Sequence, residues 1–360
     1  MNMNEVKDRI RGCLIGGAIG DALGYAVEFD RLNAILEKYG DNGITKFELS
    51  PSGKAEISDD TQMTLFTAEG LLNGLKQKDF PDQAVRDSYI DWYFTQYPGQ
   101  KNGPAFTALR ENPRLCHRRA PGGTCLDACR SLIDGREVVN DSKGCGGIMR
   151  VAPIGLLNAA LRANEGQGYA DYEVAIMADN SAKLTHKHPL GHLPAAFLAV
   201  LIDRIMEYDR EYVVRNFGKL VTDSLDFIMT LFSNAGEAAM FLLHHLVIEA
   251  LNLADSSIPA PECLNSLGEG WVAEETLAVA LFCAKRYIQD PEQAIIASVN
   301  HDGDSDSTGS VCGNIMGAIY GYDYLKSGNV CCPEGHSLED TLELSDIILD
   351  TADRLAASKQ

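Results

Sequence analysis

Hydrophobic residues recur with a helical period along most of this 360-residue chain, and alternating, strand-like runs are nearly absent. The pattern predicts helices in the aromatic segment 90–97 and in four longer segments, 191–207, 236–252, 271–288 and 340–356. Residues 44–49 are the best candidate for a strand. Turn-forming residues predict loops at 98–104, 110–124, 164–168 and 253–270. We therefore expect an all-α, compact single domain that spans residues 1–360.

Glycine repeats at every fourth position in two segments far apart in the chain. The first set is Gly12, Gly16, Gly20 and Gly24, and the second is Gly309, Gly313, Gly317 and Gly321. Positions i and i+4 share one face of a helix. Each glycine costs a helix roughly 1 kcal/mol relative to alanine, so a close approach of another backbone must offset the loss. The stripes predict two buried helices that pack closely at the centre of the fold.

Two acidic clusters each lead into a helix-like segment. The first is Ser58-Asp59-Asp60-Thr61, and the second, Asp304-Ser305-Asp306-Ser307-Thr308, starts the second glycine-striped helix. Helix capping alone explains the first cluster, whereas the second has more ligand-type residues than a cap needs. Carboxylates and hydroxyls are hard oxygen ligands that suit Mg²⁺ or Mn²⁺. If the fold brings the clusters together, they form a two-metal hydrolytic site.

Three further features are candidates for ligand contact. The glycine-rich turn Gly144–Gly147 exposes N–H groups suited to phosphates, although an ordinary turn between helices also explains it. His186 is expected to contact a ligand or to cap a helix end, and the residues alone give Glu28 no role. Cys331, Cys332 and His336 could form a C-terminal metal site, but their spacing fits no common zinc pattern.

Composition and charge narrow the possible partners. The chain is 45% hydrophobic and 23% charged, as globular proteins are, and its net charge of −20 argues against a sequence-independent grip on nucleic acid. We find no signal peptide and no apolar run of about 18 residues, so we expect no membrane span. The ten cysteines contain no CxxC motif, and reduced thiols in a cytoplasmic protein are the expected state.

Taken together, these segments resemble the ADP-ribosylglycohydrolase family, which includes dinitrogenase-reductase-activating glycohydrolase and the ADP-ribosylarginine hydrolases. The matching segments are 12–24, 58–61, 119–122, 124–126, 144–150, 185–186 and 303–308. The two acidic clusters are more specific in combination than either is alone. The resemblance implies a compact all-α fold with two Mg²⁺ ions at its centre, for which Mn²⁺ can substitute.

The resemblance also implies roles for individual residues. The implied metal ligands are Ser58, Asp59, Asp60, Asp304, Asp306 and Ser307. The implied lining of the ADP-ribose pocket is Gly144, Cys145, Gly146, Gly147 and His186. Glu28 is placed beside the metals on an entrance segment, with a gating or a catalytic role. Asp60, Glu28 and Asp304 are therefore the expected catalytic residues.

The implied activity is metal-dependent hydrolysis that removes ADP-ribose from modified proteins. An ADP-ribosylated protein is the expected partner, and free ADP-ribose is the expected product. The 303–309 run looks closer to the arginine-cleaving branch, so the N-glycosidic bond to arginine is the expected linkage. The alternatives are a non-catalytic ADP-ribose-binding relative, a hydrolase of serine-linked ADP-ribose and another two-metal hydrolase such as a phosphoesterase.

Overall fold

The computed structural model of the protein describes residues 2–77, 81–100 and 103–359. Within these residues the fold is all-helical, without strands beyond two isolated bridges, Ala55–Leu342 and Gly144–Val272. The α-helices are α1 (Met3–Tyr25), α2 (Leu32–Tyr39), α3 (Asp59–Gln77), α4 (Pro81–Gln96), α5 (Gly123–Ile133), α6 (Ala152–Glu165), α7 (Asp171–Lys183), α8 (Pro189–Ile205), α9 (Arg210–Leu231), α10 (Glu237–Ala254), α11 (Ala260–Leu267), α12 (Ala273–Arg286), α13 (Pro291–Val299), α14 (Ser305–Tyr320), α15 (Tyr322–Ser327), α16 (Leu338–Thr341) and α17 (Ser345–Ala356). The 3₁₀ helices are η1 (Ala108–Glu111), η2 (Pro113–Leu115) and η3 (Cys145–Gly147). The all-α prediction is confirmed.

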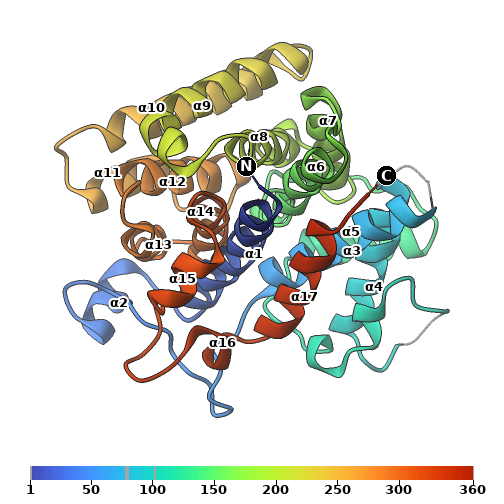
Figure 1. The fold of residues 1–360 in the computed structure, drawn as a ribbon, viewed down its shortest axis with the longest axis horizontal. Coiled ribbons are helices and arrows are strands. Elements are labelled where there is room, and N and C mark those ends of the chain that lie inside the picture. The colour runs from blue at the N-terminus through green and yellow to red at the C-terminus, as the bar shows by residue number, and fades with distance from the viewer. Residues whose placement is uncertain (1, 78–80, 101–102, 360) are drawn as a thin grey trace.

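Helices α1 and α14 pack against each other at the centre of the molecule, through the two glycine stripes (Figure 1). A Cβ atom on Gly16 would lie 2.3 Å from the carbonyl oxygen of Gly313, and one on Gly20 would lie 1.9 Å from that of Gly309. The partner number falls as the number along α1 rises, so the two helices are antiparallel. The predicted close pair of buried helices is confirmed.

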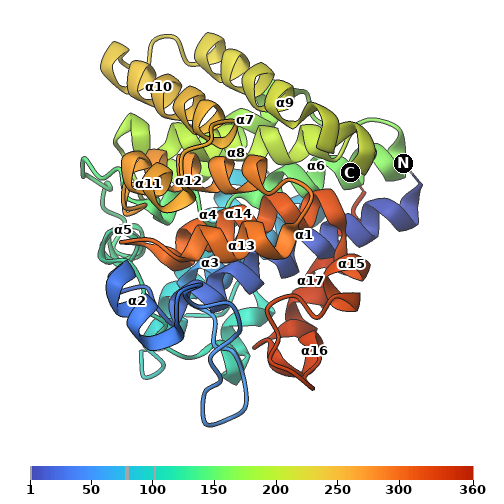
Figure 2. The same ribbon diagram turned by 90° about the vertical axis from the view of Figure 1, so that its left-hand side faces the viewer.

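The remaining helices surround this pair in layers. Helices α9 and α10 form an outer layer over α8 and α12, and α1 and α14 lie beneath these two (Figures 1 and 2). Helices α3, α4, α5 and α17 lie on another side of α1, on the right in Figure 1. The central pair is therefore shielded by helices whose outward faces meet solvent.

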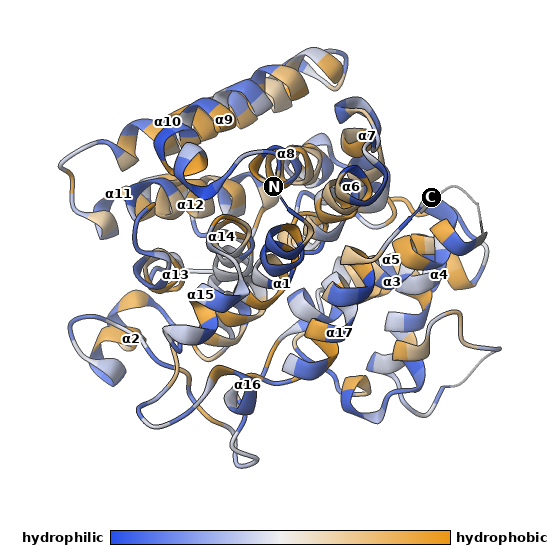
Figure 3. Ribbon diagram, in the orientation of Figure 1, coloured by the Kyte–Doolittle hydropathy of each residue, from blue (hydrophilic) through white to orange (hydrophobic). Residues whose placement is uncertain are grey.

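The outer helices show the two-faced pattern that such layers require. Along α9 and α17, hydrophobic and hydrophilic residues alternate around the ribbon (Figure 3). On α9, Val213, Phe217, Leu220 and Ile228 are buried and recur every three or four residues or a multiple of that spacing. This stripe places one face of the helix on the core and leaves the other to solvent.

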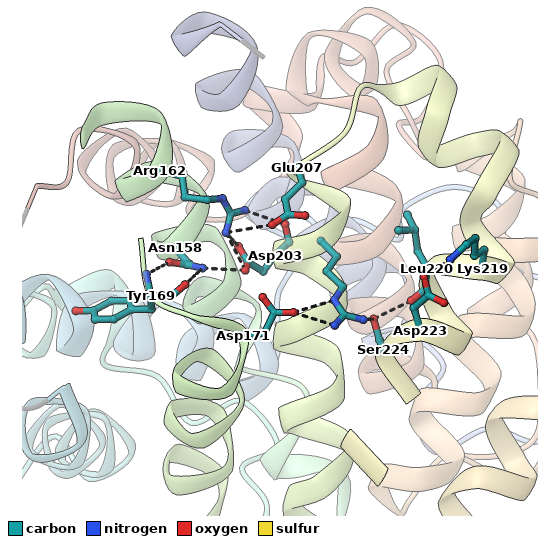
Figure 4. A network of polar contacts seen from close by, with 11 residues as sticks. Asn158, Arg162, Tyr169, Asp171, Asp203, Glu207, Lys219, Leu220, Asp223 and Ser224 are labelled. Atoms are coloured by element: carbon teal, nitrogen blue, oxygen red, sulfur yellow. Dashed lines mark hydrogen bonds and ion pairs between the residues drawn. The ribbon is translucent and has the colours of Figure 1, made fainter. Parts of the chain in front are cut away.

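A polar network joins helices α6 to α9 (Figure 4). Buried Asp203 on α8 accepts hydrogen bonds from Asn158 (2.8 Å) and Arg162 (2.9 Å) on α6. Arg204, the next residue, pairs with Asp171 on α7 at 2.8 Å and donates to Ser224 on α9 at 3.2 Å. Burial raises the pKa of Asp203 to about 6, while Arg162 opposes the rise. The network fixes how these four helices meet.

Three of the predicted long helices begin and end within two residues of α8, α10 and α12. The helix predicted at 340–356 is wrong as one element, because α16 ends at Thr341 and α17 begins at Ser345. Leu344 has a φ of 59°, a left-handed conformation that a continuous helix cannot contain. The loop predicted at 253–270 contains helix α11, and that at 110–124 contains η2. Residues 101–102 of the predicted loop 98–104 lie outside the described residues.

The strand predicted at 44–49 is also wrong, because the backbone there finds other partners. The side chain of Asn300 accepts from the N–H of Ile44 at 2.8 Å and donates to its carbonyl at 2.9 Å. The N–H of Phe47 donates to the carbonyl of Cys331 at 2.8 Å. The Asn300 side chain and the carbonyl of Cys331 thus satisfy backbone N–H and C=O groups that would otherwise need a neighbouring strand.

One helix in the described residues, α10, is long and apolar enough to cross a membrane, and 44% of it is buried within the structure. This corrects the expectation of no such segment. The buried residues of α10 include Met240, Leu243 and Val247, at the spacing of a helix packed on one side. Interior helices of globular proteins meet the same test of length and composition, so α10 alone is weak evidence for a membrane.

The glycine contact predicts a reversal of the usual effect of glycine-to-alanine replacement in a helix. Alanine normally stabilises a helix interior by roughly 1 kcal/mol. Gly16→Ala should instead lower the free energy of unfolding by about 2 kcal/mol or more, because the new Cβ meets backbone that cannot move independently. Urea unfolding should show this loss, whereas the control Gly99→Ala, with nothing within 4 Å of its Cβ, should change little. A stabilised Gly16→Ala protein would contradict the packing.

Candidate metal centre and ligand pocket

Both acidic clusters begin helices whose first residues line one cavity of about 160 Å³. Asp59 and Asp60 are the first residues of α3, and Asp304 and Asp306 stand at the start of α14. Glu28 enters the same cavity from the turn after α1. It can do so because α1 ends against the start of α14, where a Cβ on Gly24 would lie 2.2 Å from the carbonyl oxygen of Ser305.

Asp21, inside α1, holds the start of α3 in place. Its fully buried carboxylate accepts hydrogen bonds from the N–H of Ser58 (2.9 Å), the N–H of Thr61 (3.0 Å) and the hydroxyl of Thr61. Asp21 therefore caps α3 from a neighbouring helix. In the sequence, Asp21 falls only within the matching segment 12–24, and its role depends on contacts that no local pattern reveals.

The segment 119–122 fixes Asp59 from the other side. The N–H of Asp59 donates to the carbonyl of Arg119 at 3.0 Å, and the N–H of Gly122 donates to Asp59 Oδ2 at 3.3 Å. Arg119 itself pairs with Glu343 at 2.7 Å rather than with the acidic cluster. The cavity side of Asp59 is left available to a ligand.

Two serine hydroxyls join the clusters through Asp60. Ser58 Oγ lies 3.4 Å from Asp60 Oδ2, and Ser307 Oγ, from the other cluster, lies 3.3 Å from the same oxygen. The N–H of Asp60 also donates to Ser58 Oγ at 3.1 Å, so Ser58 caps α3 as well. The capping and the ligand interpretations of the first cluster are thus compatible.

The carboxylates lie close enough to share a cation. One carboxylate oxygen from each of Glu28, Asp304 and Asp306 lies within 4.8 Å of the other two, and all three residues are buried. Oε2 of Glu28 and Oδ1 of Asp60 have no hydrogen-bond partner among the described residues. Buried, unpartnered carboxylate oxygens carry a large desolvation cost unless a cation or proton meets them.

The electrostatics of the cavity favour cation binding. Burial is the main cause that raises the pKa values of Asp59, Asp60 and Asp304 well above the usual range, and the charge of Asp306 adds to each. Burial, followed by the charge of Asp306, raises the pKa of Glu28 to about 9. Oxygen-only donors at this density fit a hard divalent cation such as Mg²⁺ or Mn²⁺.

The glycine-rich turn forms another wall of the cavity, with His186 behind it. Gly144, Cys145 and Gly146 line the cavity together with His186. A Cβ on Gly146 would lie 2.8 Å from Cys125 Sγ and 2.9 Å from His186 Cε1, so this position needs glycine. Gly147 does not line the cavity. Its missing side chain instead lets the turn pack on α8, where a Cβ would lie 2.3 Å from the carbonyl oxygen of Gly191.

A hydrogen-bond chain sets the state of His186. Buried Arg150 donates to Thr185 Oγ1 at 2.7 Å, and Thr185 Oγ1 lies 2.8 Å from His186 Nδ1. We assign the hydroxyl proton to this short contact rather than to the carbonyl of Ala182 at 3.3 Å, which leaves the ring proton on Nε2, near Gly144. Burial, and then the charge of Arg150, lower the pKa of His186 to about 3. His186 is thus a neutral donor.

Aromatic residues that sequence reasoning missed stand at the mouth. Trp271 lines the cavity, and its ring stacks on that of Phe29, with centroids 6.2 Å apart. Phe29 follows Glu28 and is 76% exposed, an unusual state for a phenylalanine. In the sequence, the available signal for this aromatic pair was Phe29 directly after Glu28.

The structure brings together the predicted site residues, apart from the position of Gly147 noted above. Ser58 does not line the cavity but contacts Asp60. The alternative C-terminal metal site is not assembled in the described residues, where Cys331 and Cys332 are buried and His336 is exposed. His336 Nδ1 instead lies 3.2 Å from the carbonyl oxygen of Glu334.

Comparison with known proteins points to one family. The family model described as ADP-ribosylglycohydrolase matches residues 2–359. The chain is 26% identical over 335 residues to ADP-ribosyl-[dinitrogen reductase] glycohydrolase of Rhodospirillum rubrum, covering 90% of each chain. It is 24% identical over 369 residues to ADP-ribosylhydrolase ARH3 of Homo sapiens, covering 94% of this chain and 92% of the relative.

A solved structure has the same fold. The ADP-ribosylglycohydrolase-related protein complex aligns with a TM-score of 0.54 at 22% sequence identity, covering 98% of both chains. At that identity the likeness supports the arrangement of helices and not the chemistry.

The crowded carboxylates predict a pH-dependent stability of the metal-free protein. In the folded protein the pKa is raised to about 7 for Asp21 and to about 9 for Glu28. A carboxyl group whose pKa is higher in the folded than in the unfolded chain stabilises the fold fully at a pH below its unfolded pKa. That stabilisation is lost as the pH rises through the folded pKa. The melting temperature with chelator should therefore fall more steeply from pH 5 to pH 8 in the native chain than in Asp306→Asn, which removes one repelling charge. Asp226→Asn, at an exposed position, is the control. Equal slopes in all three proteins would contradict the electrostatics.

Proposed function

The chain belongs to the ADP-ribosylglycohydrolase family, and we propose that it is a divalent-metal-dependent hydrolase that releases ADP-ribose from modified proteins, with arginine as the preferred attachment residue. The family membership supports hydrolase activity toward ADP-ribosyl groups. The observation that carries the proposal is the meeting of Asp59 and Asp60 with Asp304 and Asp306 in one buried cavity beside a glycine-rich turn.

Six oxygen-bearing residues are proposed to hold two Mg²⁺ ions, with Mn²⁺ as a substitute. They are Ser58, Asp59, Asp60, Asp304, Asp306 and Ser307, and all six are buried. A bound divalent cation neutralises carboxylate charge and supplies Lewis acidity toward ligand oxygens. The unpartnered oxygen of Asp60 and the carboxylates that crowd around it support this assignment.

The opposite wall is suited to the diphosphate. His186 presents a neutral Nε2–H beside Gly144 and Gly146, and neutral donors hold phosphate oxygens without a charged side chain. The missing side chain of Gly146 lets Cys125 and His186 pack directly against the turn, which holds His186 beside the cavity. ADP-ribose would therefore lie with its phosphates on this turn and its distal ribose among the carboxylates.

The reaction is proposed to proceed at the anomeric carbon of that ribose. Positive charge develops on the carbon as the bond to the protein side chain breaks, and the buried carboxylates of Asp60 and Asp304 stabilise it. Glu28, buried in the same cavity beside Asp304 and Asp306, is proposed to protonate the leaving group. Asp60 Oδ1, which has no partner among the described residues, can accept the proton of the attacking water.

Charge supports the arginine linkage. A guanidinium leaving group is cationic, whereas a serine hydroxyl is neutral. A chain of net charge −20 attracts the cationic group more strongly. A non-catalytic ADP-ribose-binding protein would have no need to keep six oxygen-bearing ligand positions, which favours an enzyme over that alternative.

Removal of one metal ligand should abolish turnover without unfolding the protein. Asp304→Ala and Asp306→Ala should each lower the rate of ADP-ribose release by about a hundredfold or more, since loss of even an indirect ligand contact costs up to that factor. Free ADP-ribose released from an arginine-modified protein is the measurement, with circular dichroism to check the helices. Asp226→Ala, at an exposed position of α9, should keep full activity. Full activity in chelator-treated native protein would refute the metal-dependent mechanism.

The linkage preference is tested with two peptides that carry ADP-ribose on arginine or on serine. At equal concentration, release from the arginine-linked peptide should be faster, and added salt should narrow the difference because screening weakens the attraction of the cationic leaving group. Faster release from the serine-linked peptide would overturn the preference and leave the hydrolase proposal standing. Hydrolysis of a simple phosphate ester in place of both peptides would indicate a phosphoesterase.

A further inference from the structure

Sulfur atoms share the cavity with the carboxylates. Cys125, Cys145 and Met149 all line it, next to Asp60, Asp304 and Ser307. Cys145 Sγ lies 2.8 Å from Asp304 Oδ2, a proposed metal ligand. Hard cations such as Mg²⁺ do not favour thiol ligands, so the proposed metal centre does not account for the contact between Cys145 and Asp304.

A second sulfur approaches the same oxygen cluster. Met149 Sδ lies 3.9 Å from Ser307 Oγ, and Ser307 Oγ lies 3.3 Å from Asp60 Oδ2. Asp60 is 2% exposed, and its Oδ1 has no hydrogen-bond partner among the described residues. A thiol, a thioether and a carboxylate with an unpartnered oxygen therefore belong to residues that line one cavity. Thiolate and thioether ligands select soft or borderline cations over Mg²⁺.

We propose that Cys145 and Asp304 form a binding site for a thiophilic divalent cation, represented by Zn²⁺, within the same cavity. The inference rests on the metal centre of the proposed function for its carboxylates, but not on ADP-ribose or its hydrolysis. Cys145 coordinates as the thiolate: the S–H bond breaks, the sulfur–metal bond forms, and the proton leaves to solvent. A cation held there competes with Mg²⁺ for Asp304, so Zn²⁺ inhibits the hydrolase.

The distribution of cysteines allows a clean experiment. Eight of the ten cysteines are buried, and only Cys116 and Cys145 are partly exposed. Cys116 lies away from the cavity lining, where its Sγ is 3.6 Å from the carbonyl oxygen of Arg110. Cys116→Ser is therefore the matched control for Cys145→Ser, with the same chemical change at a residue that does not line the cavity.

The probe is Cd²⁺, a thiophilic cation whose bond to sulfur produces an ultraviolet charge-transfer band. Chelator-stripped, full-length protein is titrated with Cd²⁺, and the band gives both the presence of the sulfur bond and the dissociation constant. The native protein and Cys116→Ser should show the cavity band, and Cys145→Ser should lose it. A parallel titration with Mn²⁺, followed by electron paramagnetic resonance, gives the affinity for a hard cation.

The ratio of the two affinities decides the proposal. Cys145→Ser should weaken Cd²⁺ binding at least about tenfold relative to Mn²⁺ binding, since removal of a metal contact costs 10–100-fold. An unchanged ratio, or a band that survives in Cys145→Ser but disappears in Cys116→Ser, would overturn it. If Cys145→Ser binds neither Cd²⁺ nor Mn²⁺, Cys145→Ala takes its place. The proposal then requires that Cys145→Ala lose the charge-transfer band. Because no readout uses ADP-ribose, failure here is distinguishable from failure of the proposed hydrolysis.

Discussion

Close contact between the backbones of α1 and α14 is the constraint on which the site depends. Glycine at Gly16, Gly20, Gly309 and Gly313 lets the two helices approach until carbonyl oxygens occupy the space of missing side chains. Each glycine lowers the stability of its helix, but the close contact brings the end of α1 against the start of α14. Glu28, just after α1, therefore lies near Asp304 and Asp306. Any larger residue in this contact would separate those carboxylates.

Asp21 extends the same constraint to the second acidic cluster. It lies on α1, and its buried carboxylate holds the N-terminus of α3, which carries Asp59 and Asp60. One central helix thereby places both halves of the site. The carboxylates so gathered repel one another, and burial raises their pKa values, so the protein stores electrostatic strain where a cation can relieve it. Preorganised charge of this kind is common at catalytic centres.

Features that repeat along the chain or cluster within a few residues could be predicted from the sequence. The glycine period predicted the central pair, and Ser58-Asp59-Asp60 and Asp304-Ser305-Asp306 predicted the acidic cavity. Features that depend on distant partners could not be predicted in this way. No strand forms at 44–49, because Asn300 and the carbonyl of Cys331 bind the backbone there. The left-handed conformation of Leu344 divides a segment for which hydrophobic periodicity predicts one continuous helix. Asp21, Trp271 and the contact between Cys145 and Asp304 depend on tertiary neighbours. The single-domain extent and the cytoplasmic location stay predictions.

The central claim is that the two acidic clusters form one metal centre. Anomalous diffraction from a crystal of the protein grown with Mn²⁺ tests it most directly, because the signal locates each ion without reference to activity. The account predicts two peaks in the cavity, bounded by Asp59 and Asp60 on one side and by Asp304 and Asp306 on the other. Manganese peaks elsewhere on the protein, with none among these carboxylates, would contradict it.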